Sequence, residues 1–233
     1  MKIIVGNWKM NGTRMGFENM TKSLSEINTA NRVIICPPYT LLNLENFGIA
    51  TGAQDISSHD NGAFTGEISG QMIAETGAKY VIVGHSERRL YHNETNEMVK
   101  QKATMAIQNR LIPIICVGET LDERESGKTE KIIKEMLRDS VPNTENEIII
   151  AYEPRWAIGT GMTPTPTEIE FVHNIIFEYL KETNHETAAI LYGGSVSVAN
   201  AATITEIPHV DGLLVGGASL KTETFIPIIE SVK

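Results

Sequence analysis

The sequence of 233 residues has only two cysteines, no long apolar run and no excess of positive charge. A membrane-spanning helix needs about 20 mostly apolar residues in a row, and no stretch approaches that length. The formal net charge of −9 disfavours nucleic acid and anionic membrane surfaces as partners. The apolar run Ile3 to Val5 is too short for the apolar region of a signal peptide, so we expect none.

The sequence also lacks linkers and the motifs of metal or nicotinamide sites. No Gly/Ser-rich, Pro-rich or charge-block segment interrupts residues 1–233, which predicts one domain. There is no H-E-x-x-H motif, no Cys/His ligand spacing and no dinucleotide fingerprint, so we expect no metal and no cofactor. Cys36 and Cys116 lie within apolar runs, and we interpret them as buried free thiols of a cytoplasmic protein.

Short runs of β-branched and apolar residues recur along the chain, and most are followed by a helical pattern. We predict strands at Ile3 to Asn7, Val33 to Cys36, Ala50 to Asp55, Tyr80 to Gly84, Ile112 to Val117, Ile148 to Tyr152, Ala189 to Tyr192, and Gly212 to Val215. We predict helices at Arg14 to Ile27, Ile68 to Thr76, Glu94 to Asn109, Lys128 to Arg138, Thr167 to Thr183, Ala199 to Glu206, and Glu223 to Val232.

Strands that alternate with helices form a parallel sheet. Eight such units predict a closed (β/α)₈ barrel, although about 250 residues is the more typical length. A doubly wound sheet is the alternative, but no strand is followed by the G-x-G-x-x-G turn that would favour it. In a barrel, the residues just beyond the carboxyl ends of the strands are the candidates for chemistry.

The strand ending at Tyr152 is followed by a carboxylate, Glu153, and then by Pro154, which prevents a helix from starting there. The loop that follows has apolar tips and glycine pivots, and Thr165-Pro166-Thr167-Glu168 then begins a helix as a capping box. A carboxylate at a strand end beside such a loop can act as a general base that is closed off from water. The alternative is a solvated strand-end carboxylate.

Two other strand ends carry a candidate polar side chain. Lys9 follows the first strand, where a lysine is usually solvated. His85 follows the fourth strand and precedes a possible short helix at Ser86 to Leu90. Amides at a helix start disfavour the imidazolium, so His85 is expected to be neutral and able to donate to a developing oxyanion. Alone, it would more often be a structural histidine.

Glycine pairs follow the seventh and eighth strands, at Gly193-Gly194 and Gly216-Gly217. Backbone without side chains lets several N–H groups approach one anion, and these two loops recur as a phosphate site in barrels. Either pair alone could merely allow a tight turn. Both pairs together predict phosphate binding.

Seven segments, in order along the chain, resemble the triosephosphate isomerase family, whose fold is the TIM barrel. They are GNWKMN at 6–11, AQDIS with GAFTGE at 53–57 and 62–67, VGHSERR at 83–89, PIICVGE at 113–119, AYEPRWAIGTG at 151–161, YGGSV at 192–196, and LLVGGASL at 213–220. The resemblance implies the interconversion of dihydroxyacetone phosphate and D-glyceraldehyde 3-phosphate through an enediolate, a step of glycolysis and gluconeogenesis.

The resemblance also implies residue roles. Glu153 would be the base, His85 the neutral electrophile, and Lys9 the cation at the substrate, supported by Asn7. Phosphate would be bound by Gly159, Ser195, Gly216 and Gly217, while Ser86, Glu87 and Cys116 would support the catalytic groups from behind. Arg88 would pair with Glu94. The lid would consist of Pro154, Arg155, Trp156, Ala157, Ile158, Gly159, Thr160 and Gly161.

The family further implies a homodimer in which Phe64, Thr65 and Gly66, in the loop 57–67, insert into the partner. The chain departs from the family by a shortened segment around 39–49 and a trim near the C-terminus, and by Arg155, Met162 and Pro164 in and after the lid. Two alternatives remain. The first is another phosphosugar isomerase or epimerase, and the second is a non-catalytic protein that binds phosphorylated metabolites. The first should add a metal or further acid pairs at the strand ends, and the second should have lost Glu153, His85 or Lys9.

Overall fold

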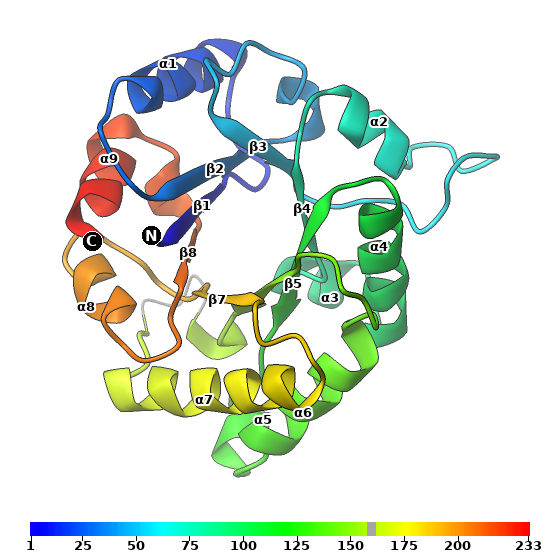
Figure 1. The fold of residues 1–233 in the computed structure, drawn as a ribbon, viewed down its shortest axis with the longest axis vertical. Coiled ribbons are helices and arrows are strands. Elements are labelled where there is room, and N and C mark those ends of the chain that lie inside the picture. The colour runs from blue at the N-terminus through cyan, green and yellow to red at the C-terminus, as the bar shows by residue number, and fades with distance from the viewer. Residues whose placement is uncertain (158–161) are drawn as a thin grey trace.

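The computed structural model describes residues 1–157 and 162–233, which form a closed barrel of eight parallel strands inside a ring of helices (Figure 1). The strands are β1 Ile3–Asn7, β2 Arg32–Cys36, β3 Ala50–Ala53, β4 Tyr80–Val83, β5 Ile112–Val117, β6 Ile149–Tyr152, β7 Ala189–Tyr192 and β8 Gly212–Val215. Each strand pairs with the next one in the chain, and β8 pairs with β1 at Leu214 and Val5. The predicted (β/α)₈ TIM barrel is confirmed.

The helices follow the strands in alternation, as a parallel barrel requires. They are α1 Arg14–Ser25, α2 Gly70–Glu75, α3 Ser86–Tyr91, α4 Asn96–Gln108, α5 Leu121–Glu125, α6 Thr129–Ser140, α7 Pro166–Glu182, α8 Ala201–Thr205 and α9 Thr222–Ser231. Short 3₁₀ turns lie at η1 Tyr39–Leu41, η2 Arg155–Ala157 and η3 Gly217–Ser219. Within the two described ranges, no helix is long and apolar enough to cross a membrane.

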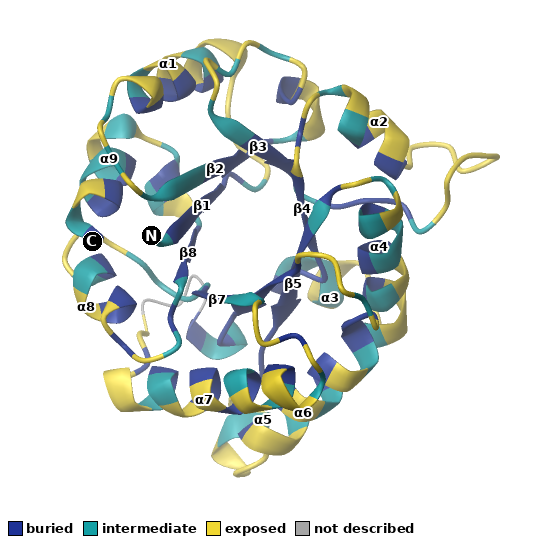
Figure 2. Cartoon of the chain, viewed as in Figure 1, coloured by how far each residue is buried: buried dark blue, intermediate teal, exposed yellow. Residues whose placement is uncertain are grey.

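Two apolar layers hold the barrel together. Side chains such as Val5, Ile82 and Ile114 fill its interior, and a larger cluster lies between the outer face of the strands and the helices. Helices therefore bury the face turned towards the strands and expose the other, as Figure 2 shows. Strands buried on both faces explain why their sequences are continuous apolar runs and do not alternate.

The predicted boundaries agree with the structure to within two residues, and the differences have local causes. β3 ends at Ala53, so Gln54 and Asp55 lie beyond the strand in which they were predicted. The helix predicted from Ile68 begins after Ser69, whose side chain accepts the Met72 N–H as an N-cap.

The second unit agrees with the predicted shortening, whereas the fifth contains a helix that the sequence did not predict. Between β2 and β3, the described chain has the η1 turn and no α-helix, which places the shortened segment on the helix side of the barrel. α5 was missed altogether. It begins with a capping box in which Thr120 and Glu123 cap each other's backbone, but its five residues are too few to show a helical period.

Candidate active site

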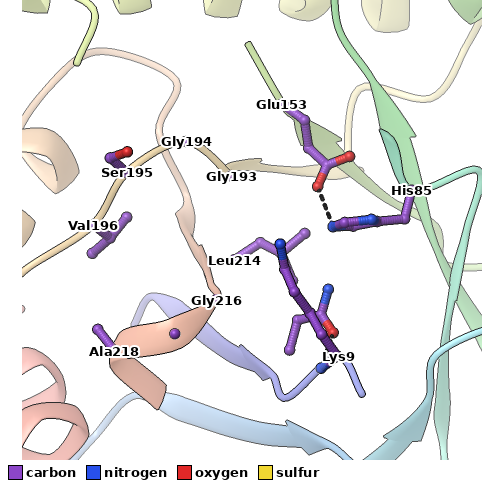
Figure 3. A pocket seen from close by; sticks show the side chains of 12 residues that line it. Lys9, His85, Glu153, Gly193, Gly194, Ser195, Val196, Leu214, Gly216 and Ala218 are labelled. Atoms are coloured by element: carbon purple, nitrogen blue, oxygen red, sulfur yellow. Dashed lines mark hydrogen bonds and ion pairs between the residues drawn. The ribbon is translucent and has the colours of Figure 1, made fainter. Parts of the chain in front are cut away.

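A cavity of about 250 Å³ opens at the carboxyl ends of the strands and brings together most of the predicted site residues. Asn7 and Lys9 come from the end of β1, His85 from β4 and Glu153 from β6 (Figure 3). The loops after β7 and β8 complete the wall with Gly193, Gly194, Ser195, Val196, Gly216, Gly217 and Ala218. Residues that are separate in the sequence meet here because parallel strands all end on the same side.

Glu153 is 2% exposed and makes two contacts through its two carboxylate oxygens. Oε1 lies 2.9 Å from His85 Nε2, and Oε2 accepts the Ser86 N–H at 2.9 Å. Burial raises the pKa of Glu153, but His85, the Ser86 amide and Lys9 lower it more, so that the net direction is downward. The solvated strand-end interpretation of Glu153 is therefore wrong.

His85 is the N-cap of α3, and its position fixes its tautomer. Nδ1 accepts the Glu87 N–H at 3.2 Å, so that atom carries no proton, and the ring proton resides on Nε2 facing Glu153. Burial lowers the pKa of His85, the Glu153 carboxylate raises it, and the net direction is upward. A neutral ring satisfies both neighbours, because it accepts at Nδ1 and donates at Nε2.

Lys9 is held at both its backbone and its side chain. Its φ of 53° lies in the left-handed region that non-glycine residues rarely adopt. The Asn7 Oδ1 accepts the Lys9 N–H at 3.0 Å, and the Lys9 ammonium lies 2.6 Å from Glu87 Oε1. The side chain extends into the cavity beside His85 (Figure 3).

The two glycine pairs differ in what surrounds them. A Cβ at Gly194 would lie 2.2 Å from the Tyr192 hydroxyl oxygen, and one at Gly193 would also be crowded, so packing requires glycine there. A Cβ at Gly217 would meet no heavy atom within 4 Å, although this residue lines the cavity. From the sequence the two pairs were equivalent. In the structure, packing within the protein explains the need for glycine at Gly193-Gly194 but not at Gly217.

The comparisons with known proteins agree with this arrangement. Residues 2–232 match the family model described as triosephosphate isomerase. A triosephosphate isomerase of Albidiferax ferrireducens is 46% identical over 242 aligned positions, which cover 99% of this chain and 98% of that protein. One of Herminiimonas arsenicoxydans is 44% identical, again over 99% of this chain and 98% of that protein. The chain belongs to the triosephosphate isomerase family.

Membership in the triosephosphate isomerase family makes the chain an isomerase of triose phosphates. The aligned lengths also exceed the 233 residues of this chain, so the alignments must open gaps in it. A short connection such as η1 between β2 and β3 leaves the strand ends, and hence the cavity, unchanged.

The structure describes the first four residues of the predicted lid, 154–157, and not the last four. Pro154 and the η2 turn Arg155–Ala157 follow Glu153 directly, and the Ser195 hydroxyl donates to the Ala157 carbonyl at 2.8 Å. The remaining predicted lid residues, Ile158, Gly159, Thr160 and Gly161, lie outside the described residues. This includes the predicted phosphate contact of Gly159.

Glu119 has a larger role than the sequence indicated. It is fully buried after β5, and its Oε1 accepts the Tyr152 hydroxyl and the Trp156 indole N–H, both at 3.1 Å. The Arg124 guanidinium lies 4.5 Å from the Trp156 ring centroid, a cation–π contact. Glu119 precedes the N-cap Thr120, so it lies outside α5 and acts through its buried contacts with Tyr152 and Trp156.

Four further residues named from the sequence do not line the cavity. Cys116 and Cys36 are free, buried thiols, and burial raises the pKa of Cys116 well above its usual value. The predicted ion pair between Arg88 and Glu94 is present, with 2.5 Å between Arg88 Nε and Glu94 Oε1. Among residues 1–157 and 162–233, no group of three or more His, Cys, Asp or Glu side chains is arranged to hold a metal ion.

Proposed function

We propose that Glu153, His85 and Lys9 catalyse the interconversion of dihydroxyacetone phosphate and D-glyceraldehyde 3-phosphate in this cavity. The observation that carries the assignment is the 2.9 Å distance between Oε1 of the buried Glu153 carboxylate and Nε2 of His85. A base and a neutral donor then flank one small space, as proton transfer next to a carbonyl requires.

Glu153 leaves His85 and Ser86 when it acts. These contacts hold its pKa down, so separation from them makes the carboxylate a stronger base. Glu153 then takes a proton from C1 of dihydroxyacetone phosphate and returns it to C2. The electron pair of the broken C–H bond moves through the enediolate, and the carbonyl passes from C2 to C1.

The freed Nε2 proton of His85 is donated to the substrate oxygen that takes up negative charge. Nδ1 stays an acceptor for the Glu87 amide, so the ring works as a neutral acid. The second proton of the reaction passes between the oxygens on C1 and C2, with His85 as the carrier. The Lys9 ammonium stabilises the enediolate, and Asn7 keeps Lys9 in its left-handed conformation.

The phosphate group of the substrate is assigned to the opposite wall of the cavity. Ser195, Gly216 and Gly217 line it, and the free space around Gly217 lets a phosphate oxygen approach the backbone. The net charge of −9 means that such local N–H groups, together with Lys9, must attract the anion. The predicted contact of Gly159 would complete this wall.

We further infer a single domain over residues 1–233, a homodimer and a cytoplasmic location, with neither nucleic acid nor membrane as partner. The negative net charge supports the last point, and two buried free thiols support a reducing compartment. The loop 57–67, in which residues 59–67 are exposed, supports the dimer.

A coupled assay with dihydroxyacetone phosphate tests the proposal. Turnover should be unchanged by a chelator and by added divalent metal, because the assigned groups are side chains. Absence of turnover, or turnover that disappears with the chelator, would exclude this mechanism.

A further inference from the structure

No residue of β3 lines the cavity. The side chains of the two residues that follow β3 nevertheless contact the backbone of Lys9 and the side chain of Arg88 on α3. Gln54 and Asp55 directly follow Ala53, where β3 ends, and neither lines the cavity. Consecutive residues in extended chain direct their side chains to opposite sides. Here one side chain reaches the Lys9 segment and the other reaches the helix that begins with His85.

Gln54 acts on the backbone of Lys9. Its Nε2 donates to the Lys9 carbonyl and to the Cys36 carbonyl, each at 2.8 Å. With Asn7 Oδ1 accepting the Lys9 N–H, both polar backbone groups of Lys9 are bound by side chains. A lysine with left-handed backbone angles persists only where surrounding contacts hold it in place. Gln54 provides the contact at the Lys9 carbonyl.

Asp55 acts on α3 through a largely buried cluster of four charges. Its carboxylate lies 2.7 Å from Lys102 Nζ and 2.9 Å from an Arg88 guanidinium nitrogen. Glu94 Oε1 lies 2.5 Å from both the Lys102 ammonium and Arg88 Nε. Asp55, Glu94 and Lys102 are buried and Arg88 is partly exposed, and the two acids and two bases neutralise one another.

Arg88 connects this cluster to the electrophile. Its N–H donates to the His85 carbonyl at 2.8 Å, in the first turn of α3. The same turn supplies the Ser86 N–H that Glu153 accepts and the Glu87 N–H that fixes the His85 tautomer. Displacement of Arg88 would therefore shift α3 and tilt the His85 ring.

We propose that the dipeptide Gln54-Asp55 is the positioning element that fixes Lys9 and His85 relative to each other. It touches no substrate. A single peptide bond joins Gln54, whose side chain restrains Lys9, to Asp55, whose side chain restrains α3 through Arg88. The inference rests on the proposed function, since it concerns the two groups that stabilise the enediolate.

The variants Gln54→Met and Asp55→Asn test it. Methionine matches the shape of glutamine but cannot donate to the two carbonyls. Asparagine keeps the shape of aspartate but removes the negative charge that Lys102 and Arg88 share, and it replaces one acceptor oxygen with an NH2 donor. Each variant should lower kcat by about 10- to 100-fold, because a misplacement of about 1 Å has that effect.

The distinguishing measurement is inhibitor binding. Phosphoglycolohydroxamate, a planar mimic of the enediolate, should bind each variant more weakly by the same factor as kcat falls. Inorganic phosphate, which reports on the wall at Ser195, Gly216 and Gly217, should bind within about twofold of wild type, because no contact of Gln54 or Asp55 reaches that wall. Equal weakening of both inhibitors, unchanged hydroxamate binding or unchanged kcat would each overturn the proposal.

The chain offers matched controls. Gln71→Met removes an exposed side chain that donates to Glu75 on α2, and Asp139→Asn removes the exposed partner of Arg138. Both should keep wild-type kinetics. If Asp55→Asn fails to fold, the charge-balanced Asp55→Asn/Lys102→Met takes its place, with the same expected loss in kcat and hydroxamate binding. Wild-type turnover in the same assay separates failure of this inference from failure of the proposed function.

Discussion

Glu153 is bound in the structure by the groups that it must leave before it can accept a proton from carbon. Its carboxylate is shared between His85 Nε2 and the Ser86 amide, and its pKa is held below the usual range. The lowered pKa therefore belongs to the resting arrangement and does not describe the base in action. The same reasoning applies to His85, whose pKa is raised by a carboxylate that departs during the reaction.

Replacing the base removes proton acceptance while keeping the shape of the side chain. Glu153→Gln should lower kcat by about 10²–10⁴-fold, the usual effect of a positioned general base, with a modest change in KM. Glu130→Gln, which alters an exposed acid paired with Lys134, is the control and should retain full activity. Steady-state kinetics on dihydroxyacetone phosphate would contradict the assignment if the Glu153→Gln variant kept more than half of the wild-type kcat.

Gly217 tests the phosphate wall at the scale of one side chain. A valine there would meet no protein atom within 4 Å of its Cβ, so folding should tolerate it, but its methyl groups would occupy the path of the anion. Hydrogen bonds to charged groups contribute about 1.5–3 kcal/mol each, so losing one should raise KM and the inhibition constant of inorganic phosphate by about 10-fold or more.

Gly217→Ala, with one carbon, should lie between the wild type and Gly217→Val. Inhibition by phosphate that is the same in all three proteins would show that the glycines only shape the turn.

At the scale of elements, the sequence predicted best where a pattern is local. The run Ile148 to Tyr152 and the capping box at Thr165 and Glu168 are both complete within a few neighbouring residues, and both were placed correctly. Repetition of such local units eight times was enough to predict the barrel. Glu153, His85 and Lys9 were likewise candidates because each follows a strand end.

Long-range polar contacts could not be predicted in this way. Glu119 receives Tyr152 and Trp156, which are 33 and 37 residues away, and Gln54 donates to Lys9 across 45 residues. Spacing carries no signal for such pairs, because their approach depends on the closure of the whole barrel. Asp55 was assigned to a strand for its neighbours' apolar character, whereas its partners lie on α3 and α4.

The end of the lid nearest α7 gives a prediction about an element. Pro164 is buried, while Met162 and Thr163 before it are exposed, and Pro164 limits its own φ and the conformation of Thr163. An alanine there should favour open conformations by about 0.4–1 kcal/mol relative to proline. Because an exposed enediolate phosphate can eliminate phosphate, Pro164→Ala should raise the fraction of turnovers that yield methylglyoxal and inorganic phosphate.

Pro166→Ala is the matched control, since Pro166 is the first residue of α7 and lies beyond the N-cap Thr165. It should leave the ratio of phosphate released to triose isomerised unchanged. If Pro164→Ala also leaves that ratio and kcat unchanged, Pro164 serves only the turn before the helix.

At the scale of the whole molecule, His173 makes stability depend on pH. Its ring is fully buried on α7, with Nδ1 2.9 Å from the His209 carbonyl oxygen, and burial lowers its pKa to about 4. In the unfolded chain the pKa is about 6.5, so below that pH the unfolded state binds a proton that the folded state does not. Stability is therefore complete above pH 6.5 and falls as the pH drops towards 4.

The loss from this one group should be about 2 kcal/mol at pH 5. Urea unfolding of the wild type and of His173→Leu at pH 7.5 and pH 5, at one protein concentration, measures it. The variant should be less stable at pH 7.5 but should lose less stability on acidification, by about that amount. Equal losses in the two proteins would show that His173 does not titrate between these pH values.

The loop 57–67 bears on the proposed homodimer. It projects beyond the ring of helices between β3 and α2 (Figure 1), and residues 59–67 are all exposed. Phe64 stacks on His59 with the ring centroids 3.8 Å apart, and Gly62 and Gly66 have positive φ values of 128° and 96°. An ordered, partly apolar loop with so little of its own chain to pack against is expected to bind another surface. Met10, 96% exposed beside Lys9, offers an apolar contact on a second copy.

Thr65→Asp places a charge in this loop and should convert the proposed dimer into a monomer. Activity should fall by about 10-fold or more, because Lys9 would lose the support of the partner's loop, and shifts of about 1 Å in a catalytic group cost up to about 100-fold. Thr187→Asp, at an exposed position before β7 on the opposite end of the barrel, should remain dimeric and active. Sedimentation and kinetics over a range of protein concentrations separate the two effects. A wild type that sediments as a fully active monomer would remove the dimer from the mechanism.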